Sequence, residues 1–254
     1  MMPIGDDSHG KGGLPIVNLV ILAANVAVFF LLQLPSDAFT MGFSAIPHEI
    51  TTGTDLVGPT PVRLPDGTTE TLDHAKGPTP IWLTLFSSMF MHGGYAHIAG
   101  NMLFLFVFGD NVEKAFGSLL YAAFYLVCGV VASLAHVFFQ TDSIIPSLGA
   151  SGAISGVLAA YLVLFPKNRV KVLMGMRFVT EVPAIVMIGM WAVFQFIAGF
   201  ASITASAQTS GVAYMAHIGG FVAGLLLAFL LRPFVDRGAP SAPSAPAGLL
   251  GRRF

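Results

Sequence analysis

The chain contains six apolar windows that are long enough, with their flanks, to cross a lipid bilayer as helices. They are Leu14–Leu34, Ile98–Phe108, Leu119–Phe139, Ser151–Phe165, Val182–Phe200 and Ala213–Leu231. Hydrophobic residues make up 55% of the 254 residues and charged residues only 10%, which leaves too little polar surface for a soluble globule. The sequence therefore predicts an all-α membrane protein: a bundle of six transmembrane helices with a long first external loop.

The positive charges fall on one side of this topology. If the N-terminus is cytoplasmic, only Arg63 and Lys76 of the twelve Lys and Arg residues lie outside. The others lie inside: Lys11, Lys114, Lys167, Arg169, Lys171, Arg177, Arg232, Arg237, Arg252 and Arg253. Because cytoplasmic loops carry an excess of Lys and Arg, we expect both termini to face the cytoplasm.

The same topology divides the chain into a membrane domain and short flanking segments. The expected parts are a cytoplasmic tip at 1–13, a six-helix domain at 14–233 and a disordered cytoplasmic tail at 234–254. Within the domain, 35–91 is an external loop insertion followed by an apolar interfacial segment. In this loop Pro65-Asp66-Gly67 predicts a turn between two short strands. The tip has no signal-peptide or transit-peptide pattern, so we expect the first span to be retained.

Ser151 opens the fourth window, in the run Gly149-Ala150-Ser151-Gly152. At the start of a helix, free backbone N–H groups and the positive dipole end favour a developing negative charge. A helix from Ser151 to Phe165 would be about 22 Å long, shorter than the hydrocarbon core of about 30 Å. Ser151 would then lie below the membrane surface, in a candidate oxyanion site. The alternative is a Gly/Ser-rich N-cap on an ordinary membrane helix.

Three of the histidines in or beside the windows are candidate functional residues, because ionisable groups are costly there and indicate function. His92 and His97 flank the start of the second window, and Asn101 follows His97 by one turn on the same helix face. His217 lies in the sixth window. The alternative for each histidine is a hydrogen bond between helices, and His92, nearest the loop, fits that alternative best.

Small residues recur every four positions in the fourth and sixth windows. They are Gly152, Gly156 and Ala160 in the fourth, and Ala216, Gly220, Gly224 and Ala228 in the sixth. Such faces let membrane helices approach closely, so we expect these two helices to pack together and to bring Ser151 and His217 to the same depth. A serine and a histidine within hydrogen-bond reach make a nucleophile and its general base. Glycines that serve only for packing, as in transporters, are the alternative.

The sequence offers little support for other chemistry. His92 and His97 lack the intervening Glu of the zincin motif, and no acidic residue lies in the external half of any window, so we predict neither a metal site nor a cofactor. Cys128 is the single cysteine, which excludes an intramolecular disulfide. The net charge of −1 argues against a nucleic-acid partner. A transporter or channel would place polar residues at mid-depth in several spans, whereas here they gather toward the external ends.

Three motifs together resemble the rhomboid family of intramembrane serine proteases. They are His92-Gly-Gly-Tyr-Ala-His97-Ile-Ala-Gly-Asn101, Gly149-Ala-Ser151-Gly152 and Ala216-His217-Ile-Gly-Gly220-Phe-Val-Ala-Gly224, on the second, fourth and sixth spans. The resemblance covers about Leu14 to Pro233. It implies a six-helix, multi-pass membrane hydrolase, a serine protease that performs intramembrane proteolysis on transmembrane segments near the external face.

The resemblance also implies a role for each matching residue. Ser151 would be the nucleophile and His217 the general base, a dyad without the carboxylate of a triad. His97, Asn101 and the backbone N–H of Ser151 would form the oxyanion hole, and His92 would be a supporting residue. The other supporting residues would be the motif glycines Gly149, Gly152, Gly220 and Gly224.

Two positions depart from the family pattern. Leu83 follows Trp82 where many members have an arginine, so anchoring of the first loop by that arginine is not expected. Ser155 stands where some members place an aromatic ring against the base, so other neighbours must orient His217.

The expected partners are transmembrane protein substrates and membrane lipid, and the expected location is a bacterial plasma (inner) membrane. The sequence leaves the oligomeric state open. A catalytically inactive rhomboid-like protein that binds membrane helices is the alternative function. The joint presence of Ser151, His217, His97 and Asn101 favours the protease, because binding alone requires none of that geometry.

Overall fold

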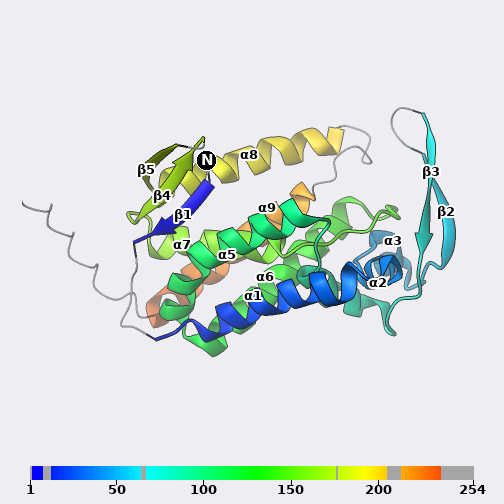
Figure 1. The fold of residues 1–254 in the computed structure, drawn as a ribbon, viewed down its shortest axis with the longest axis horizontal. Helices are drawn as coiled ribbons and strands as arrows, with labels where there is room; N and C mark the ends of the chain where they lie inside the picture. Colours follow the sequence, from blue (N-terminus) through cyan, green and yellow to red (C-terminus); the bar gives the residue numbers. More distant parts are fainter. Residues whose placement is uncertain (1, 8–12, 64–66, 176, 205–212, 236–254) are drawn as a thin grey trace, which may run out of the picture.

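The computed structural model is a bundle of helices with small β-structures at its two ends (Figure 1). It describes residues 2–7, 13–63, 67–175, 177–204 and 213–235. The helices are α1 (Ile16–Val28), α2 (Asp37–Phe43), α3 (Pro47–Thr52), α4 (Thr84–Ser87), α5 (Tyr95–Phe116), α6 (Ser118–Phe139), α7 (Ser151–Leu164), α8 (Ala184–Thr204) and α9 (Tyr214–Leu231). The strands are β1 (Met2–Asp6), β2 (Gly58–Arg63), β3 (Thr69–His74), β4 (Arg169–Met174) and β5 (Phe178–Pro183).

All six expected spans are helical, although they differ in length and composition. Among the described residues, four helical stretches are long and apolar enough to cross a membrane: Ile16–Gln33, Ser118–Phe139, Ala184–Ala201 and Tyr214–Phe234. The helix of the second window, α5, is long but carries charged residues in its last two turns. The helix of the fourth window, α7, has only 14 residues. The expected tail at 234–254 lies almost entirely outside the described residues.

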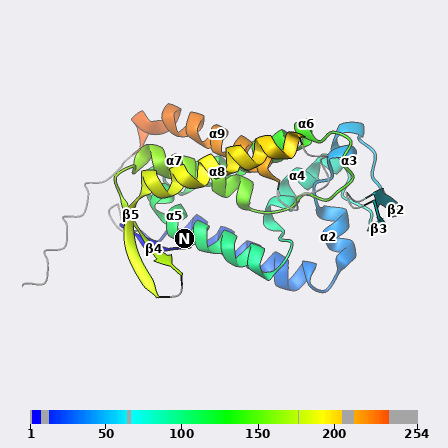
Figure 2. The same cartoon turned by 90° about the horizontal axis from the view of Figure 1, so that it is seen from above.

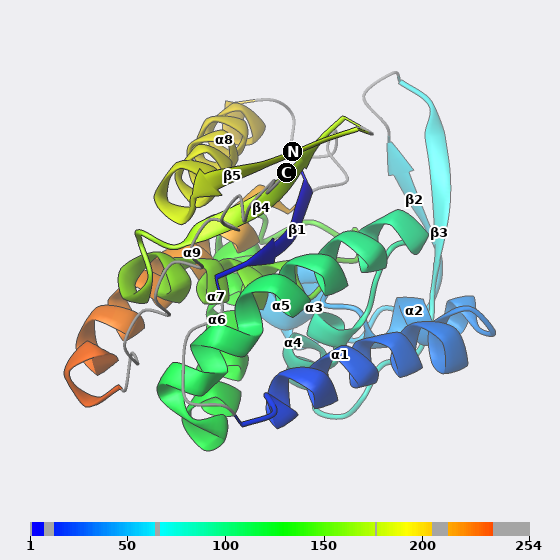
Figure 3. The same cartoon turned by 60° about the vertical axis from the view of Figure 1, so that its left-hand side comes forward.

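Helix α7 is the centre of the bundle. All of its residues except Ser151 and Leu162 are buried, and α5, α6 and α9 pack against it. Helices α1 and α8 lie on opposite outer sides of this core (Figures 1 and 3). A short helix without exposed faces cannot be an independent span in lipid, so α7 depends on its neighbours for its position.

Glycines set the distance between α7 and α9. A β-carbon on Gly220 would lie 2.0 Å from the carbonyl oxygen of Gly152, and one on Gly224 would lie 2.4 Å from that of Gly156. No side chain larger than hydrogen fits between the two backbones at these points. The predicted packing of the fourth and sixth windows is therefore confirmed. Cys128 of α6 also packs directly against Gly156.

A three-stranded antiparallel sheet, in the order β1-β4-β5, covers the end of the bundle away from the N-terminus of α7 (Figure 3). Met2 pairs with Leu173, and Arg169 pairs with Pro183. This sheet was not predicted from the sequence, since the tip at 1–13 was expected only as a flanking segment. Arg169 and Lys171 are exposed while Val170 and Val172 are fully buried, so the sheet packs one apolar face on the core.

The carboxyl group of Asp6 ties the sheet to two core helices. It accepts hydrogen bonds from the hydroxyl of Tyr161 on α7 and from Asn111 Nδ2 on α5, the latter at 2.8 Å. Burial raises the pKa of Asp6 to about 7, and the charge of Asp110 adds to the rise, while the hydrogen bonds from Tyr161 and Asn111 oppose it. The uncharged carboxyl is thus the form that the folded protein favours.

We expect the stability of the protein to fall as the pH rises through about 7, and Asp6→Asn to remove this dependence. The pKa of Asp6 is higher in the folded than in the unfolded chain, so its contribution is fully present below about pH 4 and is lost as the pH rises through the folded value. Thermal melting in detergent should show a wild-type Tm about 5 °C lower at about pH 8 than at about pH 5.5. An Asp73→Asn control, at an exposed position of β3, should keep the wild-type difference. Equal differences in wild type and Asp6→Asn would contradict this account.

The expected hairpin in the first loop is present as β2 and β3, which pair antiparallel from Gly58 with His74 to Arg63 with Thr69. It projects from the end of the bundle opposite the three-stranded sheet (Figures 1 and 2). Helices α2 and α3, which connect α1 to this hairpin, were not predicted from the sequence. Residues 64–66 of the predicted turn lie outside the described residues.

The first-loop insertion holds the loop that leads into α7. Ala45 exchanges two backbone hydrogen bonds with Ser147, at 3.0 and 2.8 Å. The backbone N–H of His48 donates to the carbonyl of Ser143 at 3.0 Å. His74 Nε2 lies 2.9 Å from the carbonyl oxygen of Ile144. The insertion therefore fixes the segment 143–147, which only Leu148 separates from the Gly149–Gly152 motif.

Two buried polar side chains fix α1 against the core. Glu113 of α5 accepts hydrogen bonds from the backbone N–H groups of Val17 and Asn18, at 3.0 and 2.7 Å, and so caps the first turn of α1. Gln33, at the other end of this helical segment, bonds to both backbone groups of His92. The first helix is thereby held at both of its ends.

Candidate active site

The candidate nucleophile Ser151 is the first residue of α7. Gly149 has φ +141°, a backbone conformation that favours glycine, and its N–H donates to the carbonyl of Ser88 at 2.9 Å. The chain thus turns sharply before the helix begins. No side chain in the described segments caps this helix N-terminus. The N–H groups of its first turn therefore remain free to receive a negatively charged oxygen beside Ser151.

The structure brings Ser151 and His217 together. Ser151 Oγ lies 2.7 Å from His217 Nε2, although the two residues are 66 positions apart in the sequence. The contact follows from the glycine packing, because Gly152 and Gly220, each within three residues of one partner, lie backbone to backbone. The distance is that of a good hydrogen bond between a hydroxyl group and an imidazole nitrogen.

The second ring nitrogen of His217 contacts a glutamine on α8. His217 Nδ1 lies 2.7 Å from Gln195 Oε1, and Gln195 is only 7% exposed. The rings of Trp191 and Tyr214 lie near the imidazole, with centroids at 6.1 and 6.4 Å. Sequence reasoning missed Gln195, although a glutamine in the middle of an apolar window is the signal that could have identified it.

His97 and Asn101, the candidate oxyanion donors, face the same place from α5. The backbone N–H of Gly93 donates to His97 Nδ1 at 3.2 Å, so the neutral ring carries its proton on Nε2. A β-carbon on Gly149 would lie 3.1 Å from this Nε2 and 3.4 Å from Ser151 Oγ, which places the N–H donor beside the nucleophile. Asn101 Nδ2 is buried and has no hydrogen-bond partner among the described residues. Both side chains offer donors to an incoming oxygen.

His92 lies behind His97 and does not line the cavity that holds Ser151. It is 2% exposed, and its ring packs edge-on against His97 with centroids 5.2 Å apart. Its backbone is clamped by Gln33, whose Oε1 accepts from the His92 N–H at 2.7 Å. This position fits a supporting residue that holds His97 in place. Gln33 is a further contributor that the sequence analysis did not identify.

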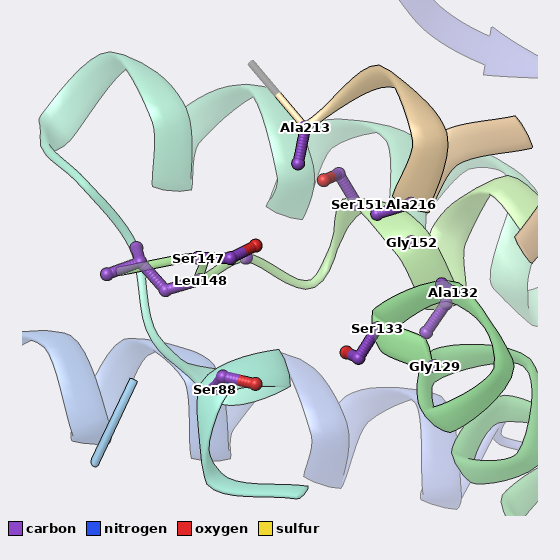
Figure 4. A pocket seen from close by; sticks show the side chains of 12 residues that line it. Ser88, Gly129, Ala132, Ser133, Ser147, Leu148, Ser151, Gly152, Ala213 and Ala216 are labelled. Carbon is purple, nitrogen blue, oxygen red and sulfur yellow. The ribbon is translucent and has the colours of Figure 1, made fainter. Parts of the chain in front are cut away.

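Ser151 and His217 open into a cavity of about 850 Å³, which is large enough for several residues of an extended peptide. Its remaining lining comes from α5, α6, α7, α8 and the loop before α7, and includes His97, Asn101, His136, Trp191 and residues 145–148. A smaller cavity of about 20 Å³ adjoins Ser151 on the other side. Figure 4 shows Ser88, Ser133 and Ser147 around this smaller cavity, which has room for about one water molecule.

The described residues contain no group of three or more His, Cys, Asp or Glu side chains that could hold a metal ion. The chemical groups that converge at this place are instead the Ser151 hydroxyl, the His217 imidazole, and the Asn101 Nδ2 donor, which has no partner among the described residues. Such a constellation is the kind of site that serine hydrolases use.

The comparison with protein families gives the same assignment as the motifs. A model of the rhomboid domain matches residues 80–234, more than half of the sequence, and the chain belongs to the rhomboid family. Family membership and the apolar helices together make it a multi-pass membrane protein.

Several curated proteins are similar to this chain. The rhomboid protease GluP of Bacillus subtilis is 32% identical over 173 residues, which cover 68% of this chain and 28% of GluP. The rhomboid protease AarA of Providencia stuartii is 32% identical over 167 residues, which cover 60% of this chain and 57% of AarA. Rhomboid protein 1, mitochondrial, of Saccharomyces cerevisiae is 28% identical over 159 residues, or 61% of this chain and 43% of the yeast protein. The chain thus spans between about a quarter and three fifths of the length of these relatives.

Proposed function

We propose that this protein is an intramembrane serine endopeptidase that cleaves transmembrane segments of other membrane proteins. The observation that carries the proposal is the 2.7 Å contact between Ser151 Oγ and His217 Nε2 in a cavity of about 850 Å³. Asn101 Nδ2, which has no hydrogen-bond partner in the described part of the chain, supports the proposal further, because a protein that only binds helices gains nothing from a buried donor without a partner. The similarity to the rhomboid proteases GluP and AarA points to the same activity.

The reaction begins with proton transfer from Ser151 Oγ to His217 Nε2 while the oxygen attacks the scissile carbonyl carbon. The resulting tetrahedral oxyanion accepts hydrogen bonds from His97 Nε2, Asn101 Nδ2 and the backbone N–H of Ser151. Each such donor is worth about 3 to 4 kcal/mol of transition-state stabilisation in other serine hydrolases. The imidazolium then gives its proton to the leaving amine nitrogen, and the C–N bond breaks to leave an acyl ester on Ser151.

A water molecule completes the cycle. It attacks the ester carbonyl while His217 takes its proton, and the proton passes to Ser151 Oγ as the second product leaves. The smaller cavity beside Ser151 is polar and of a size that suits this water. No cofactor and no metal ion is needed for any of these steps.

The proposed topology has six spans, with α5 and α7 as the second and fourth. Both termini and the β1-β4-β5 sheet then face the cytoplasm of a bacterium, and the first-loop insertion lies outside the plasma membrane. This orientation leaves only Arg63 and Lys76 outside. Ser151, at the outer end of the short helix α7, then lies below the external membrane surface, and 14–233 forms the membrane domain.

The substrate would have to unwind near the site, because a helix hides the carbonyl groups that Ser151 must attack. Residues of poor helix propensity near the scissile bond lower that cost. We therefore expect single-span substrates with glycine or β-branched residues near the external end of the span.

Cleavage of such a substrate by the purified protein in proteoliposomes tests the proposal. We expect a fluorescently labelled transmembrane peptide to be cut by the wild-type protein and Ser151→Ala to lower the rate by about 10⁴-fold or more. A fluorophosphonate probe should label the wild type and leave Ser151→Ala unlabelled. Equal cleavage by both proteins would refute the assignment of the nucleophile. Binding of the peptide without cleavage by the wild type would favour the inactive helix-binding relative.

A further inference from the structure

Gln195 is a buried amide in the apolar middle of α8. It lies near the middle of α8, is 7% exposed, and has aromatic or aliphatic residues on both sides along the chain. A glutamine inside a membrane span costs free energy unless it is hydrogen-bonded. Its carbonyl oxygen Oε1 forms that bond with His217 Nδ1 at 2.7 Å. The hydrogen bond that offsets the cost of burying Gln195 is therefore made with the candidate general base itself.

This bond determines which nitrogen of His217 carries the proton. An amide oxygen can only accept, so Nδ1 must donate, and the neutral ring keeps a lone pair on Nε2. Nε2 is the atom that faces Ser151 Oγ at 2.7 Å. The lone pair is thus directed at the hydroxyl proton that a general base must remove. With the opposite tautomer, Nε2 would donate to Ser151 and could not accept its proton.

The other neighbours of His217 do not fix this choice. Trp191 and Tyr214 lie near the ring with centroids at 6.1 and 6.4 Å, and neither ring forms a hydrogen bond with Nδ1. On α7 the residue one turn after the nucleophile is Ser155, whose hydroxyl donates to the Ser151 carbonyl at 2.6 Å and not to the imidazole. Within the described residues, Gln195 alone forms a hydrogen bond with Nδ1.

We propose that Gln195 is a positioning residue that holds His217 in the tautomer and orientation that catalysis requires, so that Ser151, His217 and Gln195 form one hydrogen-bonded chain. The inference rests on the proposed protease function. It differs from a carboxylate triad in that a neutral amide orients the imidazole without adding a charge in the apolar bundle. It also divides the site among three helices, since Ser151 lies on α7, His217 on α9 and Gln195 on α8.

The ability of His217 to accept the Ser151 proton then depends on the position of α8 in the bundle. Helix α8 lies on the outer side of the bundle and packs mainly on α9, with fewer contacts to α7 (Figures 1 and 3). A displacement of α8 by about 1 Å would lengthen the 2.7 Å contact beyond hydrogen-bond range. The amide therefore links the position of α8 to proton transfer at Ser151.

Three variants in the cleavage assay separate this role from simple packing. Gln195→Leu removes the acceptor, and Gln195→Glu keeps an oxygen acceptor in either protonation state. Met190→Leu is the control on the same helix and should keep the wild-type kcat, because Met190 is exposed on α8 and does not line the cavity. We expect Gln195→Leu to lower kcat by about 10- to 100-fold with KM within about twofold, and Gln195→Glu to stay within about fivefold of wild type. Wild-type kcat in Gln195→Leu, or equal losses in the Leu and Glu variants, would overturn the proposal.

A second measurement does not depend on activity. The ¹⁵N spectrum of histidine-labelled protein reports the tautomer of His217, whose signals are identified by their loss in His217→Ala. We expect the wild type to carry the proton on Nδ1 and Gln195→Leu to move it in part to Nε2. An Nε2-protonated ring in the wild type would overturn the inference even if the protein is a protease. If the protein shows the expected tautomer but cleaves no substrate, the proposed function is refuted, whereas the hydrogen bond between Gln195 and His217 is supported.

Discussion

Replacing His217 by alanine is expected to lower kcat for a transmembrane peptide by about 10⁴-fold while the protein remains folded. The imidazole is the only group within hydrogen-bond distance of Ser151 Oγ, among the described residues, that can take its proton. Without it, the hydroxyl is a poor nucleophile at neutral pH. Initial rates of cleavage, measured at saturating peptide, provide the test.

The double variant Ser151→Ala with His217→Ala should be no slower than either single variant, because residues that act as one unit give non-additive losses. Thermal melting serves as the control for folding. The two helices are held by the glycine contacts rather than by the imidazole, so the Tm of His217→Ala should stay within a few degrees of wild type. A folded variant that retains more than about a tenth of the wild-type kcat would show that another group acts as the base.

Replacing Gly220 by alanine is expected to reduce activity at least 100-fold, although it adds a single methyl group. The added β-carbon would lie 2.0 Å from the carbonyl oxygen of Gly152, which is well inside van der Waals contact. Neither atom belongs to a flexible side chain, so α7 and α9 must move apart by about 1 Å or more. The same movement separates Ser151 from His217, since each lies within three residues of the contact.

Gly189→Ala on α8 is the matched control for this prediction. A β-carbon there meets nothing within 4 Å, and alanine favours a helix over glycine by about 1 kcal/mol. We therefore expect unchanged activity and an unchanged or higher Tm in Gly189→Ala, but a lower Tm and lost cleavage in Gly220→Ala. Wild-type kcat in Gly220→Ala would mean that the geometry of Ser151 and His217 does not depend on this helix contact.

The arrangement around Ser151 could be anticipated because its determinants are local and repeated. Small residues at every fourth position identify a packing face even when its partner is unknown. The spans that contain Ser151 and His217 each have such a face, so the two spans can be predicted to pack together. The hairpin of the first loop was also predictable, since Pro65-Asp66-Gly67 is a strong turn signal. These features depend on residue type and spacing alone.

Gln195 and the β1-β4-β5 sheet were not predicted, because each depends on a partner that is distant in the sequence. Gln195 stands in an aromatic-rich stretch, and only the assembled bundle places its amide at the Nδ1 of His217. The segment Arg169–Met174 does alternate between exposed and buried residues, which is typical of a strand. Its charges were interpreted only as markers of orientation, and its pairing with Met2–Asp6 brings together residues more than 160 positions apart.

The contacts that residues before position 80 make with the site determine how much of the chain the site needs. The rhomboid domain match begins at residue 80, yet the chain before that point supplies the Gln33 amide that clamps His92 and the bonds from Ala45 and His74 that hold 143–147. A chain that began at Pro80 would leave Glu113 buried without the N–H groups of α1 and the lead-in to Ser151 without its supports. The segments before residue 80 therefore hold the site in place, although the matched domain begins only at residue 80.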